Sequence, residues 1–279
     1  MRIPAALQRE WSHDPDWLAE LPRLVHECAE QWGLDIEEPV GTPRSLVVPA
    51  GEFVLKLNAP SHFEADHEAT ALECWAGNGA VRLVALDDGR RAFLMERCRP
   101  GTALADLGVD PTVVLADLLP RLWVEPASDH PFRLIADEAE RWAADVNSAY
   151  ERAGRPFERS LVLAALDVFR TCDRRAVTLV NQDLHGGNVL AAEREPFLVI
   201  DPKPAIGERE VSGVGLLRNA ARKGGAREVR RWLAALAELG LDVDLLRSWG
   251  VAHALAWGRD REGRWSPSAV EAARAAAAA

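Results

Sequence analysis

The chain has 279 residues, 48% of them hydrophobic and 27% charged, so it can form one large or two small globular domains and is not a disordered protein. Its net charge of −10 argues against a nucleic-acid partner, because phosphate binding needs a basic surface. A membrane span is not predicted, because the chain has no run of about 18 apolar residues. The charged N-terminus does not resemble a signal peptide, and the four scattered cysteines include no CxxC pair. Together these features predict a cytoplasmic protein.

The N-terminal part of the chain begins with a predicted helix and a strand pair. Residues 15–33 carry apolar side chains at helical spacing, and Gly33 ends the pattern. Two short apolar runs, 45–48 and 53–57, predict strands that are joined by a turn at 49–51.

A second helix and strand pair follow. Residues 61–76 predict a helix with Ser61 as its N-cap and with acidic residues in its first turn. The next two apolar runs flank Asp88-Gly89, a turn typical of hairpins. The first hundred residues therefore predict a small α+β lobe.

The composition changes after Pro100-Gly101. Residues 103–173 and 225–257 are rich in Ala, Leu and Arg and predict helices, and a strand–turn–strand segment, 177–201, separates them. We therefore expect an antiparallel-sheet lobe (1–98), a linker near 96–101 and a larger, mainly helical lobe (99–279).

Three oxygen-bearing side chains mark the ends of the predicted strands in segment 177–201. Asp183 and Asn188 lie in a polar loop after the first strand, and Asp201 follows an apolar strand directly. If the strand after Asn188 and the strand before Asp201 pair as a hairpin, Asn188 and Asp201 come together. Oxygen ligands that converge in this way suit Mg²⁺. Asp183 would then be placed to accept the proton of an attacking hydroxyl. The alternative is an ordinary polar turn, in which Asp and Asn are common.

Lys56 is one of only three lysines and interrupts an apolar strand, where an ammonium is costly without a partner. Glu68 on the following helix is the candidate partner, with Glu64 one turn earlier as its competitor. The alternatives are a solvated lysine at a strand edge and a solvated helix face.

The segment NQDLHGGNVLAAEREPFLVIDPKP resembles the catalytic and metal-binding segments of the aminoglycoside phosphotransferase superfamily. Within it, the chain is most similar to the streptomycin 6-kinase and hydroxyurea phosphotransferase family. The segments LPRLVHECAEQWGL, VRLVALDDGRRAFLMERCRPGTAL and LDVDLLRSWGVAHAL also resemble that family, so the similarity covers most of the chain. The resemblance implies a two-lobed, protein-kinase-like α+β fold.

The resemblance also implies a role for individual residues. Asp183 matches the catalytic aspartate, and Asn188 and Asp201 match the two magnesium ligands. Lys56 matches the lysine that holds the α- and β-phosphates of ATP, and Glu68 matches the glutamate that pairs with it.

Three further residues are expected at the nucleotide on the same basis. Met95–Cys98 matches the hinge that offers backbone groups to adenine, which makes Glu96 and Cys98 candidate cofactor-binding residues. Ser45 is expected near the nucleotide phosphates.

Two departures from the family pattern affect these expectations. Asn181 stands where the family usually has a histidine that organises the catalytic loop, although an amide can also donate and accept hydrogen bonds. After Asp201, Glu208 and Glu210 only loosely replace the family's acidic residues. Lys203 is interpreted as an exposed loop lysine, with the steadying of a phosphate or a nearby carboxylate as the alternative.

The resulting hypothesis is an ATP- and Mg²⁺-dependent phosphotransferase. It would act on a hydroxyl of a small molecule, expected to be streptomycin or a related aminoglycoside, and so confer antibiotic resistance. The alternatives are a kinase of another small alcohol, a sugar or hydroxyurea, and a nucleotide-binding pseudokinase. We expect a monomer or homodimer. Residues 1–98 carry 17 acidic and 9 basic residues, so most of the negative charge lies outside the lobe expected to bind the acceptor.

Overall fold

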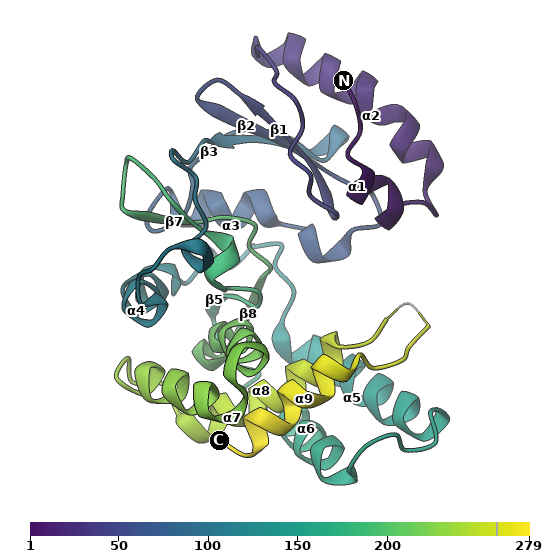
Figure 1. Cartoon of the computed structure of the whole chain (residues 1–279), viewed down its shortest axis with the longest axis vertical. Helices are drawn as coiled ribbons and strands as arrows, with labels where there is room; N and C mark the ends of the chain where they lie inside the picture. The colour runs from purple at the N-terminus through teal and green to yellow at the C-terminus, as the bar shows by residue number, and fades with distance from the viewer. Residues whose placement is uncertain (261) are drawn as a thin grey trace. The chain divides into compact units, whose positions relative to one another are not determined.

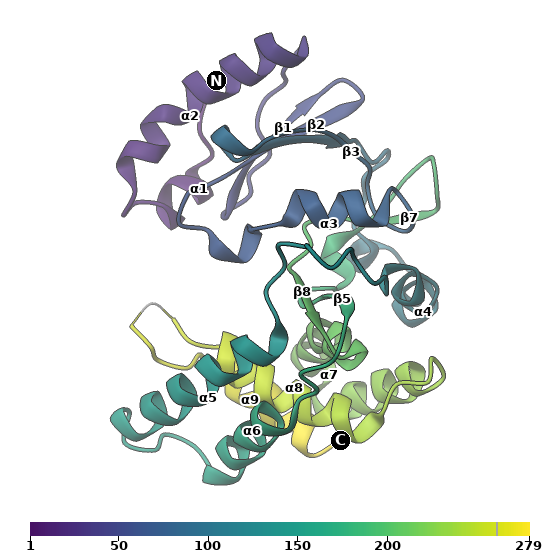
Figure 2. The same ribbon diagram turned by 180° about the vertical axis from the view of Figure 1, so that it is seen from behind.

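The computed structural model describes residues 1–260 and 262–279, and for Glu64 it describes the backbone only (Figures 1 and 2). The chain divides into two compact units. The first unit comprises Met1–Thr102 and Leu190–Asp201, and the second comprises Ala103–Val189 and Pro202–Ala279.

The first unit is built on a four-stranded antiparallel sheet with the strand order β1-β2-β4-β3. Its strands are β1 (Ser45–Ala50), β2 (Phe53–Asn58), β3 (Leu83–Asp87) and β4 (Ala92–Glu96). The predicted hairpins around 49–51 and Asp88-Gly89 are both confirmed. In the register of the central strands, Lys56 of β2 lies opposite Val47 of β1 and Phe93 of β4.

Helices cover both faces of this sheet, as Figures 1 and 2 show. The helices α1 (Ala5–Glu10) and α2 (Pro15–Trp32) pack on one face, where Leu21 and Val25 join Leu55 and Leu57 in one buried cluster. Because side chains alternate along a strand, Lys56 and Asn58 point to the opposite face, toward α3 (Glu68–Trp75). The predicted helix 15–33 is confirmed, and Gly33 ends it in the left-handed conformation with φ 63°.

The helix predicted over 61–76 is wrong at its start. A short 3₁₀ turn occupies Phe63–Ala65, Asp66 is extended and His67 is left-handed with φ 64°, so α3 begins only at Glu68. Ser61 is therefore not its N-cap. The carboxylate of Asp66 accepts a hydrogen bond from Arg91 (2.7 Å), a tertiary contact that favours the extended backbone over a continuous helix.

The second unit is mainly helical. Its helices are α4 (Pro111–Leu122), α5 (Ile135–Arg152), α6 (Arg159–Thr171), α7 (Val214–Ala237), α8 (Val243–Trp257) and α9 (Pro267–Ala277). The helix α8 packs against α6, α7 and α9, and its Trp249 is fully buried. A kink at Gly224 and Gly225 divides α7, so the predicted helix start at 225 falls at this break. The part of α7 before the kink, and the helix α9, were not predicted.

Short strand pairs carry the polar loop. Strand β5 (Thr178–Asn181) pairs with β8 (Pro204–Gly207), and β6 (Val189–Ala191) pairs with β7 (Phe197–Val199). The predicted hairpin of segment 177–201 is thus β6–β7, while β8 was not predicted. The α+β, kinase-like fold class is confirmed by the small antiparallel sheet, the mainly helical remainder and the structural comparisons given below. In the described part of the chain no helix is long and apolar enough to cross a membrane.

Candidate active site

Lys56 is held between two carboxylates within the first unit. It is only 4% exposed, and its Nζ donates to Glu68 Oε1 at 2.6 Å and to Asp201 Oδ1 at 2.7 Å. Glu68 is also buried, whereas the side chain of Asp201 is 36% exposed. Lys56 is therefore not a solvated edge lysine, and Glu68 is its partner on α3. The side chain of the competing candidate, Glu64, lies outside the described part of the structure.

The electrostatics of this cluster keep Lys56 charged. Burial opposes the charged form, but the negative charges of Asp201 and Glu68 outweigh it, so the pKa of Lys56 lies above its ordinary value. The ring of Phe93 adds a third contact, with its centroid 5.9 Å from Nζ. A permanently cationic group on a buried strand face is suited to binding phosphate.

A hydrogen-bonded chain extends the cluster along the same sheet face. Asn58 Nδ2 donates to Glu68 Oε2 at 3.4 Å, and Ser45 Oγ donates to Asn58 Oδ1 at 2.6 Å. Ser45 thus supports Glu68 through Asn58, and its expected proximity to the nucleotide phosphates stays a prediction. The sequence analysis missed Asn58, although its position two residues after Lys56 places it on the same face of β2.

The candidate hinge lies at the end of β4. The carboxylate of Glu96 accepts hydrogen bonds from Arg194 Nε and Nη2 and from the Arg82 N–H at 2.9 Å. Because this side chain is occupied, contact with adenine would fall to backbone groups. Burial, and then the charge of Glu96, raises the pKa of the Cys98 thiol to about 11, so it stays protonated at neutral pH.

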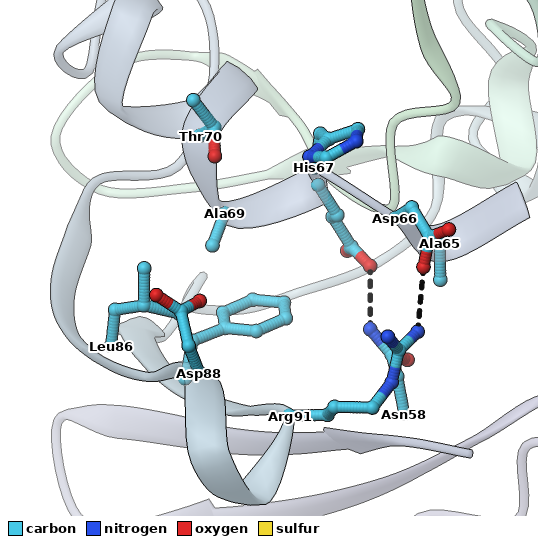
Figure 3. Close-up of a pocket in the computed structure, with 11 residues that line it drawn as sticks. Asn58, Ala65, Asp66, His67, Ala69, Thr70, Leu86, Asp88 and Arg91 are labelled. Atoms are coloured by element: carbon cyan, nitrogen blue, oxygen red, sulfur yellow. Dashed lines mark hydrogen bonds and ion pairs between the residues drawn. The ribbon is translucent and has the colours of Figure 1, made fainter. Parts of the chain in front are cut away.

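A pocket of about 360 Å³ opens beside α3 in the first unit (Figure 3). Its lining includes Glu68 and Phe93, both of which contact Lys56, but not Lys56 or Asp201. In Figure 3 the hydrogen bonds Asn58–Glu68 and Arg91–Asp66 lie along one side of it. The pocket therefore adjoins the partners of Lys56 without including the predicted phosphate-binding group.

The candidate catalytic loop, residues 181–188, lies in the second unit. Hydrogen bonds hold the backbone of Asp183 at both its N–H and its C=O. The N–H of Asp183 donates to Asn181 Oδ1 (3.1 Å), and its C=O accepts from Asn188 Nδ2 (3.0 Å). Asn181 is 1% exposed, and its Oδ1 also accepts the N–H of Lys203 (3.0 Å). Asn181 therefore organises the loop through its amide oxygen.

His185 and the two glycines shape the turn between Asp183 and Asn188. The N–H of Gly187 donates to His185 Nδ1 at 3.0 Å, which leaves the ring proton of a neutral imidazole on Nε2. A Cβ on Gly187 would lie 2.9 Å from the His185 ring, so a larger residue here would push the ring away from this hydrogen bond. His185 Nε2 lies 3.8 Å from Asp183 Oδ2. His185 therefore orders this turn.

Two glutamates near this loop have structural roles, and a nearby lysine is buried. Glu208 accepts the N–H of Asp173 (2.9 Å) and the indole N–H of Trp249 (2.7 Å), and Glu210 accepts the N–H of Asp242 (3.1 Å). Both glutamates therefore stabilise contacts between segments that are distant in the sequence. The prediction of an exposed Lys203 is wrong. Lys203 is 6% exposed, because its backbone exchanges hydrogen bonds with Asn181 and Gln182 at the β5–β8 pair.

The sequence analysis also missed Arg218 on α7. Its guanidinium forms an ion pair with the carboxylate of Asp183, and both side chains are mostly buried. No local sequence signal indicates this contact, because 35 residues separate the two positions.

Asn188 and Asp201 carry oxygen atoms of the kind that Mg²⁺ binds. Because the Asn188 amide donates through Nδ2 to Asp183, its Oδ1 is the atom that can face a cation. Among the described residues no cluster of three or more His, Cys, Asp or Glu side chains has metal-binding geometry. An Asn–Asp donor set therefore fits an ion that takes its other ligands from water and phosphate. That Asn188 and Asp201 converge stays a prediction.

Solved structures with the same fold define the class of protein. The choline kinase LicA from Streptococcus pneumoniae has a TM-score of 0.60 at 11% identity, over 92% of this chain and 98% of that one. A thermostable mutant of aminoglycoside phosphotransferase APH(4)-Ia, in a ternary complex with AMP-PNP and hygromycin B, has a TM-score of 0.59 at 14% identity, over 93% and 98% of the two chains. The fold is therefore that of the kinase-like phosphotransferases.

Sequence comparison identifies the family within this class. Residues 36–262 match the model of the aminoglycoside/hydroxyurea antibiotic resistance kinases. A streptomycin 6-kinase from Streptomyces griseus is 34% identical over 254 residues, which are 86% of this chain and 82% of that protein. A hydroxyurea phosphotransferase from Kitasatospora aureofaciens is also 34% identical, over 84% of this chain and 71% of that protein. The chain belongs to this family and is an ATP-dependent small-molecule phosphotransferase, so the predicted family resemblance is confirmed.

Proposed function

We propose that this protein transfers the γ-phosphate of ATP to a hydroxyl of streptomycin or a related aminoglycoside and thereby confers antibiotic resistance. The observation that carries the proposal is the match of residues 36–262 to the resistance-kinase family, with streptomycin 6-kinases among the 34% identical relatives. The buried Lys56–Glu68 pair and the fixed loop around Asp183 supply groups that suit this chemistry.

Residues 1–98 form the nucleotide-binding lobe in this proposal. Lys56 holds the α- and β-phosphates with its ammonium, and Glu68 keeps that ammonium in place. Ser45 lies near the phosphates, and the backbone of Glu96 and Cys98 binds adenine. Because Lys56 is charged and fixed before the nucleotide arrives, little reorganisation accompanies phosphate binding.

Asn188 and Asp201 would hold Mg²⁺, which when bound offsets negative charge on the phosphate oxygens. The amide orientation of Asn188 supports this assignment, because its Nδ2 is committed to the Asp183 carbonyl and its oxygen is not. Asp201 also contacts Lys56 at 2.7 Å, so the lysine and the proposed metal ligand are neighbours within one unit.

Asp183 acts on the acceptor, in the lobe of residues 99–279. Its carboxylate orients the acceptor hydroxyl and takes the hydroxyl proton while the oxygen attacks the γ-phosphorus in line. One O–P bond forms to the acceptor, the bond from the γ-phosphorus to the β–γ bridging oxygen breaks, and ADP leaves with that electron pair. The backbone of Asp183 is held at both its N–H and its C=O, which supports a positioning role of this kind.

Other acceptors are the second candidate. The 34% identical hydroxyurea phosphotransferase favours hydroxyurea as the alternative, and other small alcohols and sugars follow. A nucleotide-binding pseudokinase is disfavoured, because Asn181 holds Asp183 through its backbone N–H although it replaces the family histidine. We further propose a cytoplasmic protein that acts as a monomer or homodimer.

The direct test is acceptor-dependent release of ADP. Purified protein is incubated with Mg²⁺-ATP and with streptomycin, other aminoglycosides, sugars or hydroxyurea, and the phosphorylated product is identified by mass spectrometry and NMR. We expect turnover with streptomycin or a related aminoglycoside. Turnover with hydroxyurea alone would reassign the acceptor, and no turnover with any of them would count against the proposal.

Asp183→Ala tests the assigned mechanism. We expect kcat to fall by roughly 10³-fold or more, because general acid–base groups contribute about 10²–10⁴-fold. Nucleotide affinity should stay within about twofold of wild type. Asp167→Asn on the exposed face of α6 is the matched control and should leave both values unchanged. Wild-type transfer by Asp183→Ala would refute the mechanism.

A further inference from the structure

The first turn of α7 packs directly on the backbone of the catalytic loop. Gly215 lies at this contact, where an added Cβ would be 2.5 Å from the Leu184 carbonyl oxygen and 3.1 Å from the Asp183 carbonyl carbon. Both are backbone atoms and cannot swing away, so the approach requires glycine. The position of α7 relative to Asp183 is therefore fixed by main-chain contact.

Arg218 lies one helical turn after Gly215 and so shares its face of α7. Its Nη2 donates to Asp183 Oδ1, and the side chains are only 15% and 19% exposed. Such a pair is less screened by solvent than a surface ion pair. In the described part of the chain Arg218 pairs with no carboxylate other than Asp183.

The guanidinium of Arg218 also packs near the aromatic ring of Trp257. The centroid of the Trp257 ring on α8 lies 5.8 Å from the guanidinium carbon. The Trp257 ring in turn packs on the buried His253 ring, with 4.3 Å between their centroids. A planar guanidinium that rests on a packed aromatic surface keeps its orientation better than a flexible ammonium would.

The carboxylate of Asp183 has only its side-chain torsions left to fix, because Asn181 and Asn188 hold its backbone. We propose that Arg218 is the positioning residue of the reaction. Arg218 holds Oδ1 of Asp183 in its ion pair, so that Oδ2 of Asp183 alone is presented to the acceptor hydroxyl. The proposal rests on the phosphotransferase function above, and it adds a residue that acts through Asp183 rather than on the substrate.

The proposal predicts a specific kinetic signature for Arg218→Ala. We expect kcat to fall by about tenfold to a hundredfold, since an error of about 1 Å in the position of a reacting group costs rates of that order. The KM for ATP should stay within about twofold, because Lys56 and its partners are untouched. Arg218→Lys keeps the charge but loses the planar fork, and its kcat should lie between those of wild type and Arg218→Ala.

Chemical rescue separates positioning from a purely structural role. The alanine variant leaves a space beside Trp257 that matches a free guanidinium ion, so guanidinium chloride at roughly tens of millimolar should restore part of its kcat. It should not restore Arg218→Lys, whose side chain fills that space. Arg222→Ala, one turn further along α7 and exposed, is the matched control and should keep wild-type kcat.

The outcomes distinguish this inference from the proposed function. If the wild type shows no acceptor-dependent turnover, the proposed function fails and the inference fails with it. If the wild type turns over and Arg218→Ala retains or exceeds its kcat, this inference alone is overturned. A loss of kcat that parallels a loss of thermal stability, without rescue by guanidinium, would also overturn it. A lower kcat with guanidinium rescue and an unchanged melting temperature would support it.

Discussion

The buried imidazole of His253 should make the stability of the protein depend on pH. The ring is 1% exposed on α8, and its centroid lies 4.3 Å from that of Trp257 and 6.1 Å from that of Trp142. Neither ring nitrogen has a hydrogen-bond partner in the described part of the chain. Burial, and then the nearby positive charge of Arg218, lowers the pKa of His253 well below 6.5.

The sign of the effect follows from proton linkage. Below about pH 6.5 an exposed histidine in the unfolded chain binds a proton, whereas His253 in the native chain stays neutral. The stabilisation is therefore complete above pH 6.5 and is lost as the pH falls toward the lower native pKa. One pH unit below 6.5 the loss from this group is about 1 kcal/mol relative to alkaline pH.

The assay compares wild type with His253→Phe, which keeps an aromatic ring but cannot bind a proton. Urea unfolding from pH 7.5 to pH 5.5 should show the wild-type free energy of unfolding falling by about 1 kcal/mol more than that of the variant. His26→Gln is the control, because His26 is 72% exposed, and its curve should run parallel to wild type. Parallel curves for wild type and His253→Phe would refute the reasoning.

Two further substitutions test the Lys56 cluster of the first unit and the Asp183 loop of the second. Glu68→Gln removes the buried negative charge beside Lys56, the proposed phosphate-binding group. We expect a loss of about 1–3 kcal/mol in unfolding free energy and roughly tenfold weaker nucleotide binding by calorimetry. Glu73→Gln on the exposed face of α3 should change neither. Gly215→Ala forces a methyl group against the Leu184 carbonyl. We expect a loss of about 1–3 kcal/mol in unfolding free energy despite the better helix propensity of alanine, together with a lower kcat and unchanged nucleotide affinity. Gly108→Ala, with open space around it, should stay near wild type in thermal denaturation and turnover.

The Lys56 cluster was predictable because its signals in the sequence are local. A lysine within an apolar strand needs a partner, and the next helix along the chain offered Glu68 and Glu64. The register and the side-chain alternation of β2 then place Lys56 and Asn58 on the face toward α3. The start of α3 was not predictable in this way, because a tertiary contact between Asp66 and Arg91 stabilises the break in the helical pattern.

The environment of Asp183 was only partly predictable, because some of its contacts are local in sequence and others are tertiary. Asn181, Asn188 and the two glycines lie within a few residues of it, and the sequence alone suggested a tight polar loop. Arg218 reaches it only because Gly215 lets α7 pack on the loop, a tertiary event that no short window of sequence contains. The burial of Lys203 likewise depends on the pairing of β5 with β8.

The net charge of −10 is not evidence for a cationic acceptor. Residues 1–98 carry 17 acidic and 9 basic residues and so account for −8 of the total of −10. In the second unit the acidic side chains nearest to the family's pattern, Glu208 and Glu210, are occupied by backbone and indole N–H groups, and Asp183 is paired with Arg218. Residues 99–279 carry 26 acidic and 24 basic residues, a net charge of only −2, so long-range attraction of a cation has little basis in that part of the chain. Selection of an acceptor would then rest on shape and hydrogen bonding around Asp183, so that the geometry imposed by Arg218 bears on which hydroxyl reacts as well as on how fast.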